Sequence, residues 1–138
     1  MEIKHEVPQE LLEAIQASGM QPRLEYALFA FGDILYIPGN FEPTPDILAH
    51  EEIHSAQHKA YTGGPEAWWG RYIDDPWFRA QQEAEAYAEQ YSYVCDHVLK
   101  DRNQRFNYLL KLATFLSGPL YGNVVSRSAA LEMIKKEL

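Results

Sequence analysis

Three side chains that can bind a metal or carry a proton lie close together in the segment Ile47–Ala60. They are His50, Glu51 and His54, in the order His-Glu-x-x-His. Residues four apart on an α-helix lie on one face, about 6 Å apart, so both imidazoles can reach one metal ion. Glu51 lies about 100° around the helix from His50, so its carboxylate is expected beside the metal and not among its ligands.

This combination is typical of a hydrolytic zinc site, in which two histidines and one carboxylate hold the ion and water takes the fourth position. The ion lowers the pKa of that water toward neutrality, and a glutamate takes its proton. We therefore predict that His50 and His54 bind Zn²⁺ and that Glu51 is the general base. The third protein ligand must come from another part of the chain.

The residues around the motif predict a helix with well-defined ends. Thr44 is a good N-cap, Pro45 suits the first helical position, and an acidic residue follows them at the positive end of the helix dipole. Gly63-Gly64-Pro65 is expected to stop the helix. Small and apolar residues recur at helical spacing and predict a packing face, namely Ala49, Ile53, Ala56 and Ala60.

A second predicted helix, capped by Asp75 and begun by Pro76, offers the third ligand. Glu83 and Glu85 point about 200° apart on it, so only one of them can face the first helix. Glu83 lies at the edge of the apolar stripe of this helix, and we therefore predict that Glu83 is the third ligand. That stripe consists of Trp77, Ala80, Ala84, Tyr87, Tyr91, Val94 and Val98. The alternative role for Glu83 is an ion pair with Arg79, one turn earlier.

Between Pro45 and Tyr91 the chain resembles the gluzincin branch of the zinc metallopeptidases. His50, Glu51 and His54 match the His-Glu-x-x-His motif, and Glu83-Ala84-Glu85-Ala86 matches the Glu-x-x-Ala pattern with Glu83 in the ligand position. One position departs from the larger members, because Tyr87 stands where they have an aspartate that supports the ligands.

A wider pattern resembles short metallopeptidase-like proteins of bacteria and their phages. It consists of Gln57, Gly64-Pro65, Trp68, Arg71-Tyr72, Tyr87 and Gln90. The resemblance implies a zincin-like fold, a Zn²⁺ cofactor and a peptide or protein substrate. It does not imply which substrate.

Composition limits the other classes of function. A chain of 138 residues is expected to form a single domain, residues 1–138. Its net charge of −8 argues against non-specific nucleic-acid binding and against attraction to anionic membranes. The lone Cys95 allows no intrachain disulfide, and no signal peptide or membrane span is expected. These features predict a cytoplasmic protein, in the host cytoplasm or virion if a phage encodes it.

The predicted fold is α+β and mostly α: a small β-hairpin packed beside the motif helix, the Glu83 helix across it, and two C-terminal helices that complete the core. The hairpin is predicted over Tyr26–Ile37 with its turn at Gly32-Asp33, and it is expected either to hold a substrate at its edge or only to cover the motif helix. The other helices are predicted over Pro8–Ser18, Phe106–Leu116 and Ser126–Leu138, with a loop or extended segment over Leu120–Val125.

Several residues near the motifs have alternative roles. The aromatic segment Gly63–Asp74 is expected to pack in the core or to line the site, and Arg71 either stabilises an oxyanion or pairs with an acid. His58, one turn beyond His54, either supports the ligands or is solvated.

For the whole chain, the leading hypothesis is a zinc-dependent peptidase. The alternatives are a non-catalytic zinc-binding virion or host-interaction protein, and a helical domain without a metal.

Overall fold

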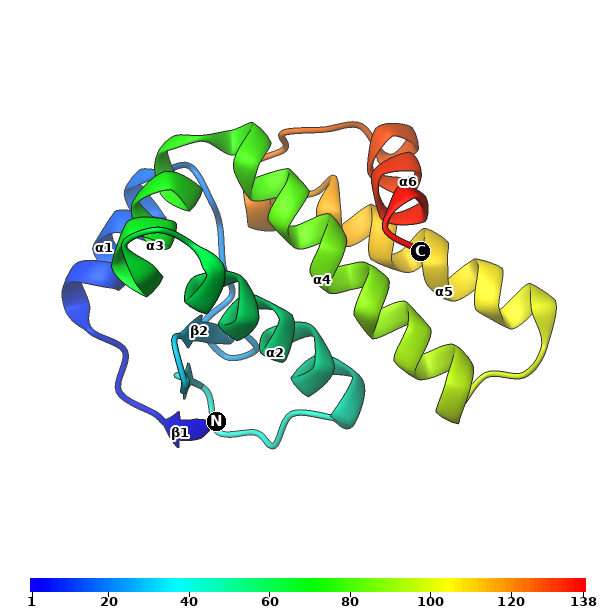
Figure 1. The fold of residues 1–138 in the computed structure, drawn as a ribbon, viewed down its shortest axis with the longest axis horizontal. Coiled ribbons are helices and arrows are strands. Elements are labelled where there is room, and N and C mark those ends of the chain that lie inside the picture. Colours follow the sequence, from blue (N-terminus) through cyan, green and yellow to red (C-terminus); the bar gives the residue numbers. More distant parts are fainter.

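Helices dominate the structure, a computed structural model that describes residues 1–138. It is an α+β fold, as predicted (Figure 1). In chain order the elements are β1 (Glu2–Lys4), α1 (Gln9–Ala17), β2 (Phe29–Phe31), β3 (Ile34–Tyr36), α2 (Pro45–Ala60), α3 (Gly64–Asp74), α4 (Pro76–His97), α5 (Arg102–Leu116), the 3₁₀ helix η1 (Pro119–Tyr121) and α6 (Arg127–Lys136). None of these helices is both long and apolar enough to cross a membrane.

The predicted hairpin is present as β2 and β3, which pair antiparallel around the turn at Gly32 and Asp33. Sequence reasoning missed β1, which pairs parallel with β3, so the sheet order is β1-β3-β2. All three residues of β1 are exposed, so no alternation of apolar and polar residues marks it as a strand. The sheet lies on the opposite side of α2 from α4 (Figure 1).

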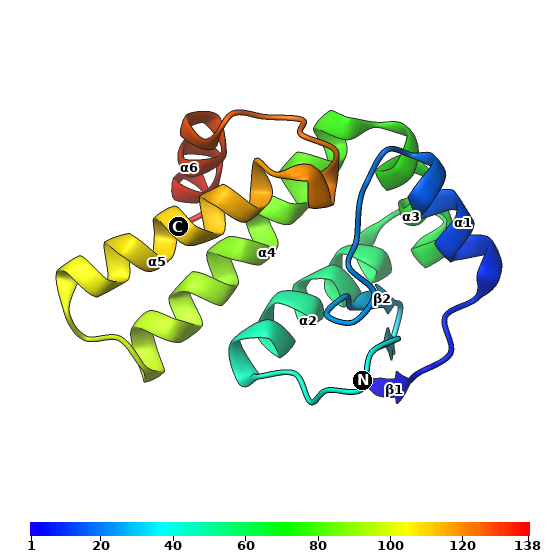
Figure 2. The same ribbon diagram turned by 180° about the vertical axis from the view of Figure 1, so that it is seen from behind.

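Helix α4 lies between two apolar cores (Figures 1 and 2). One core joins α4 to α5, η1 and α6 and includes Tyr87, Leu112 and Ile134. The other joins α1, the hairpin and α3 to the start of α4 and includes Phe29, Trp68 and Phe78. The side of α4 between these cores faces α2, and Glu83 lies there.

Aspartate side chains cap the starts of α4 and α5, whereas Thr44, the predicted N-cap of α2, makes no side-chain cap hydrogen bond. The Asp75 side chain accepts from the backbone N–H groups of Trp77 and Phe78 and so caps α4 as predicted. Asp101 caps α5 by accepting from Gln104, so this helix begins at Arg102, earlier than the predicted Phe106. The expected loop at Leu120–Val125 begins with the last residues of η1.

The predicted packing face of α2 is wrong. Ala56 and Ala60 are exposed and Ala49 and Ile53 are half-buried. The buried residues of α2 are all polar, namely His50, Glu51, His54, Ser55 and His58. The reason is tertiary: the surface of α4 that covers α2 carries polar partners, so α2 turns its polar side inward.

Arg79 fastens the beginning of α4 to the rest of the chain. Its side chain is buried and donates to the backbone carbonyl oxygens of Tyr72 (3.0 Å), Ile73 (2.7 Å) and Tyr121 (2.8 Å). Gly122, at φ +91°, leaves room for it, because a Cβ there would lie 3.2 Å from Arg79 Nη1. The alternative ion pair between Arg79 and Glu83 is therefore wrong.

We expect the Arg79→Ala substitution to lower the free energy of unfolding by about 3 kcal/mol or more, because it leaves three carbonyls without donors. Urea denaturation of the purified variant measures this. Arg71→Ala is the control: Arg71 is exposed, pairs with Asp75 at 3.5 Å and lies over the Phe78 ring, 4.2 Å from its centroid, so its loss should cost about 1–2 kcal/mol, less than that of Arg79. Equal losses in the two variants would contradict the role of Arg79.

Candidate metal centre

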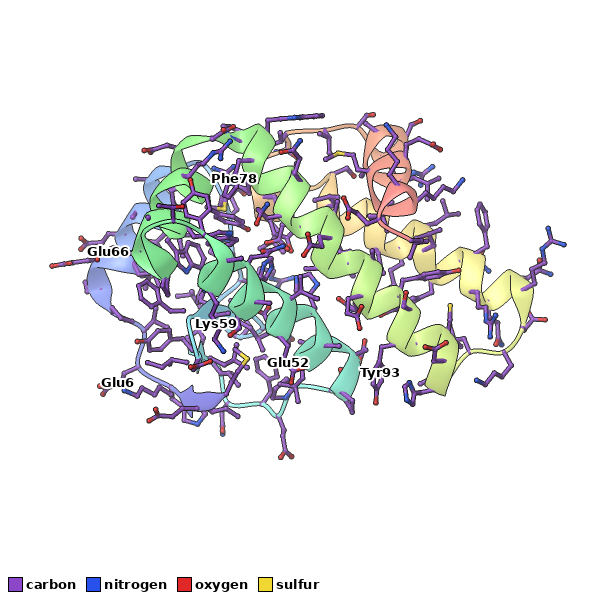
Figure 3. The ribbon with its side chains drawn as sticks, in the orientation of Figure 1. Glu6, Glu52, Lys59, Glu66, Phe78 and Tyr93 are labelled. Atoms are coloured by element: carbon purple, nitrogen blue, oxygen red, sulfur yellow. The ribbon has the colours of Figure 1, made fainter.

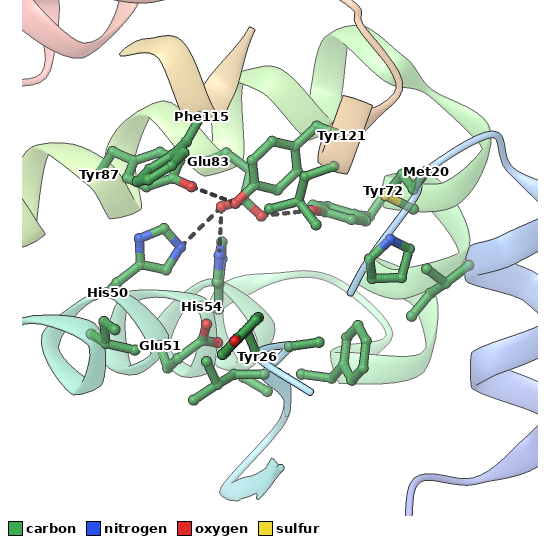
Figure 4. Close-up of a pocket in the computed structure, with 18 of the residues that line it drawn as sticks. Met20, Tyr26, His50, Glu51, His54, Tyr72, Glu83, Tyr87, Phe115 and Tyr121 are labelled. Atoms are coloured by element: carbon green, nitrogen blue, oxygen red, sulfur yellow. Dashed lines mark hydrogen bonds and ion pairs between the residues drawn. The ribbon is translucent and has the colours of Figure 1, made fainter. Parts of the chain in front are cut away.

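Two histidines of α2 and one glutamate of α4 converge at a single buried point (Figure 4). The Nε2 atoms of His50 and His54 lie 3.0 and 3.1 Å from the same oxygen, Oε1 of Glu83. The potential ligand atoms of the three residues all lie within 4.8 Å of one another. The predicted ligands are therefore brought together, and Glu85 is exposed on the other side of α4.

The second nitrogen of each histidine is held by a glutamine. Gln90 Nε2 donates to the hydroxyl of Tyr108 (2.9 Å), which turns Gln90 Oε1 toward His50 Nδ1, 3.0 Å away. Gln57 Nε2 donates to the carbonyl of Gln82 (3.0 Å), which turns Gln57 Oε1 toward His54 Nδ1, 2.8 Å away. Because amide oxygens only accept, each Nδ1 carries the proton and donates.

These tautomers direct the lone pair of each Nε2 toward the centre. At the centre the two lone pairs face Glu83 Oε1, which is also only a hydrogen-bond acceptor when the carboxylate is ionised. Three acceptors converging in a buried site require a positive charge between them, either a proton or a metal ion. The donor set thus fits a divalent cation, with the histidines oriented for it in advance.

Tyr72 fixes the third ligand. Its hydroxyl donates to Glu83 Oε2 at 2.5 Å, which leaves Oε1 free to face the histidines. Burial raises the pKa of Tyr72, as do the charge and the hydrogen bond of Glu83, so the hydroxyl keeps its proton. Burial alone would raise the pKa of Glu83, but the opposing effects of His54 and His50 lower it, so this carboxylate is ionised.

Two of the three separations between ligand atoms are compatible with one shared metal ion. Ligand atoms about 2.0–2.1 Å from zinc in a tetrahedral arrangement lie on the order of 3.3 Å from one another. The two distances to Glu83 Oε1, 3.0 and 3.1 Å, are close to that value.

Glu51 lies beside the centre and is not one of its three ligands. It is buried, and this burial raises the pKa of its carboxyl group; the charge of Glu83 acts in the same direction, while His50 and His54 act against it. A carboxylate whose pKa is raised is a stronger proton acceptor than an exposed glutamate, which suits a general base.

A largely apolar cavity of about 280 Å³ adjoins the centre (Figure 4). Residues from α1, the segment before β2, the motif helix α2, and α3, α4, α5 and η1 line it, and Glu51 and the three ligand residues are among them. Trp68, Trp69 and Tyr72 of α3 are buried in the core and also line the cavity, so both predicted roles of this segment hold.

The hairpin covers α2 and its edge is closed at Ala30. The carbonyl of Ala30 accepts from Trp69 Nε1 at 2.9 Å, and the Ala30 backbone also hydrogen-bonds Glu51. At this position β2 has no free backbone groups for an added strand.

His58 and Arg71 lie outside the ligand set. His58 is fully buried, which corrects the prediction that it could be solvated. Its Nδ1 accepts from the backbone N–H of Gly32 at 2.9 Å, and its ring packs on Trp68, with burial lowering its pKa to about 3. Arg71 pairs with Asp75, the second of its predicted roles.

Sequence reasoning did not assign roles to Gln57, Tyr72 and Gln90. Helical periodicity contains the signal, since Gln90 lies two turns after Glu83 on the same face of α4. Gln90 binds His50 Nδ1, while Tyr87 packs edge-on against the His50 ring, 4.5 Å between centroids.

Comparison with known proteins gives no relative: no family model, no curated protein and no solved structure matches the chain. The assignment of this site therefore depends on its own residues and geometry.

We expect Glu83→Gln to abolish stoichiometric metal binding, because the amide supplies no negative charge between the two histidines. The control is Glu85→Gln, an exposed position on the same helix, which should bind metal as the wild type does. Elemental analysis after reconstitution with zinc measures both. Retention of about one zinc per chain in Glu83→Gln would contradict the ligand assignment.

Raising the pH should destabilise the metal-free protein and stabilise the metal-loaded one. Burial alone would lower the pKa of His54, but the charge of Glu83 and its hydrogen bond outweigh this and raise it from 6.5 to about 9. The folded state therefore gains stability from this proton below pH 6.5 and loses it as the pH rises to about 9. Metal binding displaces the same proton, so it strengthens over that range.

Urea denaturation between pH 6.5 and 9, with zinc or with a chelator, tests this dependence. In Glu83→Gln the loss of stability in chelator should be much smaller, because the anion that raises the pKa of His54 is gone. A metal-free wild type whose stability is constant or rises over the range would contradict the expectation.

Proposed function

We propose that this chain is a zinc-dependent metallopeptidase with a zincin-like fold. The observation that carries the proposal is the convergence of His50, His54 and Glu83 on one buried point, with Glu51 outside the ligand set and facing the same cavity. A metal that served only structure would need no ionisable side chain and no cavity beside it.

Zinc is the ion that this donor set fits best. Two imidazole nitrogens and one carboxylate oxygen are the ligands of catalytic zinc, and they leave one position for water or substrate. When bound, zinc supplies the chemistry of a Lewis acid, which polarises a carbonyl group and makes water acidic.

The protein side chains supply the positioning and the proton transfer. Gln57 and Gln90 fix the two imidazoles, and Tyr72 fixes Glu83. Glu51 accepts a proton from the attacking water at its carboxylate and then gives it to the nitrogen that leaves when the peptide bond breaks. Burial raises the pKa of Glu51, which makes its carboxylate a stronger base than an exposed glutamate for the first of these steps.

The second candidate is a zinc-binding protein without catalysis. It is favoured by the hydrogen bonds of the buried tyrosines that line the cavity. The Tyr72 hydroxyl is bound to Glu83, and those of Tyr87 and Tyr121 are bound to each other at 2.7 Å. The Tyr72 proton is therefore already engaged, and only one of the two hydroxyls of the Tyr87–Tyr121 pair keeps a proton to donate to an oxyanion.

We expect Glu51→Gln to bind zinc normally and to lose peptidase activity by about a thousandfold or more, because glutamine cannot accept the proton. The control is Glu52→Gln, which changes the same charge on the exposed side of α2 and should retain activity (Figure 3). Cleavage of a broad peptide library by the zinc-loaded proteins, followed by mass spectrometry, measures the difference.

Two outcomes would count against the proposal. Loss of zinc together with activity in Glu51→Gln would show that Glu51 helps to hold the metal. Absence of any cleavage by the zinc-loaded wild type would favour the non-catalytic candidate.

A further inference from the structure

We infer that the site selects an internal, uncharged stretch of a polypeptide by enclosing one bulky apolar side chain next to the metal centre. This inference rests on the proposed peptidase function, and it adds the substrate class and an endopeptidase mode of action. Four observations carry it: the composition of the cavity, the absence of a partner for either chain terminus, the closed edge of β2, and the apolar cavity mouth.

The cavity is built to receive apolar surface. Of the 21 residues that line it, 15 are hydrophobic. Its wall includes Ile15, Met20, Phe29 and Trp69, all buried in the core that joins α1, the hairpin and α3. A volume of about 280 Å³ lies just below the range of about 300–1,000 Å³ that holds a drug-sized ligand, so it suits one or two large side chains.

The cavity offers no partner for a C-terminal carboxylate apart from the metal. No lysine or arginine lines it. The nearby Arg79 is buried, and all three of its nitrogens donate to backbone carbonyls. Lys111 packs on the Phe115 ring, 5.8 Å from its centroid, and does not line the cavity. A carboxylate in this cavity would be a buried, unpaired charge.

An N-terminal ammonium group has no free partner either. The acids that line the cavity are Glu51 and Glu83, and both already have roles at the centre. Asp46 does not line it, and its carboxylate accepts from Tyr108. With neither terminus accommodated, the bond that reaches the centre must lie within a chain and not at its end.

A substrate cannot bind as an added strand at Ala30, the residue of β2 next to Glu51, so strand pairing there does not determine which substrate binds. The Ala30 backbone is already bound by Trp69 and Glu51, so a substrate cannot pair with it there. Burial of a substrate side chain is then the main source of binding free energy at this point.

Exposed apolar side chains continue the cavity lining to the protein surface. Tyr26, Phe115 and Leu120 are large and exposed, they come from three separate segments, and all three line the cavity. Figure 4 shows Tyr26 and Phe115 on opposite sides of the centre. A chain that enters therefore meets apolar surface on both sides of the opening, which favours uncharged neighbours next to the bulky residue.

Binding to the zinc-loaded Glu51→Gln protein tests the inference without relying on turnover. The probes are hexapeptides acetylated and amidated at their ends, with Phe, Ala or Glu at a central position and Gly or Ser elsewhere. Isothermal titration calorimetry should show the Phe peptide binding about ten- to a hundredfold tighter than the Ala peptide, and the Glu peptide weakest. A dipeptide that contains Phe should bind more weakly with free termini than when it is acetylated and amidated at its ends.

Phe115→Arg and Phe106→Arg are a matched pair of variants in the Glu51→Gln background. Both phenylalanines are on α5 and similarly exposed, 45% and 48%, but only Phe115 lines the cavity. Phe115→Arg should weaken binding of the Phe peptide by about tenfold and strengthen that of the Glu peptide, while Phe106→Arg should change neither.

Equal binding of the three blocked peptides, absence of binding by all of them, or tighter binding of peptides with free termini would overturn the inference. Cleavage by the zinc-loaded wild type is scored separately. Selective binding without cleavage would count against the peptidase function and leave the selectivity standing, whereas cleavage confined to terminal residues would support the function and overturn the endopeptidase mode.

Discussion

The buried carboxylate of Glu83 is the constraint on which the rest of the structure depends. It is ionised, it lies between α2 and α4, and the two imidazole nitrogens that face it direct lone pairs toward it. Without a cation this arrangement would be strongly unfavourable in an interior of low dielectric constant. The packing of α2 on α4 and the binding of a positive charge at the centre are therefore energetically linked.

The surrounding hydrogen bonds prepare the centre for that charge. Gln57 belongs to the same helix as the histidine that it holds, whereas Gln90 and Tyr72 bring in α4 and α3. Arg79 in turn fastens the beginning of α4 to the end of α3 and to η1. The orientation of each ligand side chain is thus fixed by a hydrogen bond to another residue. This reduces the entropy cost of ordering the site when a metal binds.

Local rules were sufficient for the motif helix and for the choice of Glu83. The Thr44-Pro45 start of α2 and the Asp75-Pro76 start of α4 depend only on adjacent residues, and the 100° step separates Glu83 from Glu85. The buried face of α2 could not be predicted in this way, because its burial depends on partners such as Gln90 that lie far along the chain. For the same reason β1, an exposed strand without a pattern of its own, depends on β3 for its identity.

The same exclusion of water serves both the chemistry and the selectivity of the site. Burial among apolar residues raises the pKa of Glu51, which strengthens its carboxylate as a base. That apolar lining also makes a charged substrate group costly and an apolar side chain favourable. A polar substitution deep in the cavity would therefore alter the base and the specificity together, whereas a change at the exposed mouth can alter the specificity alone.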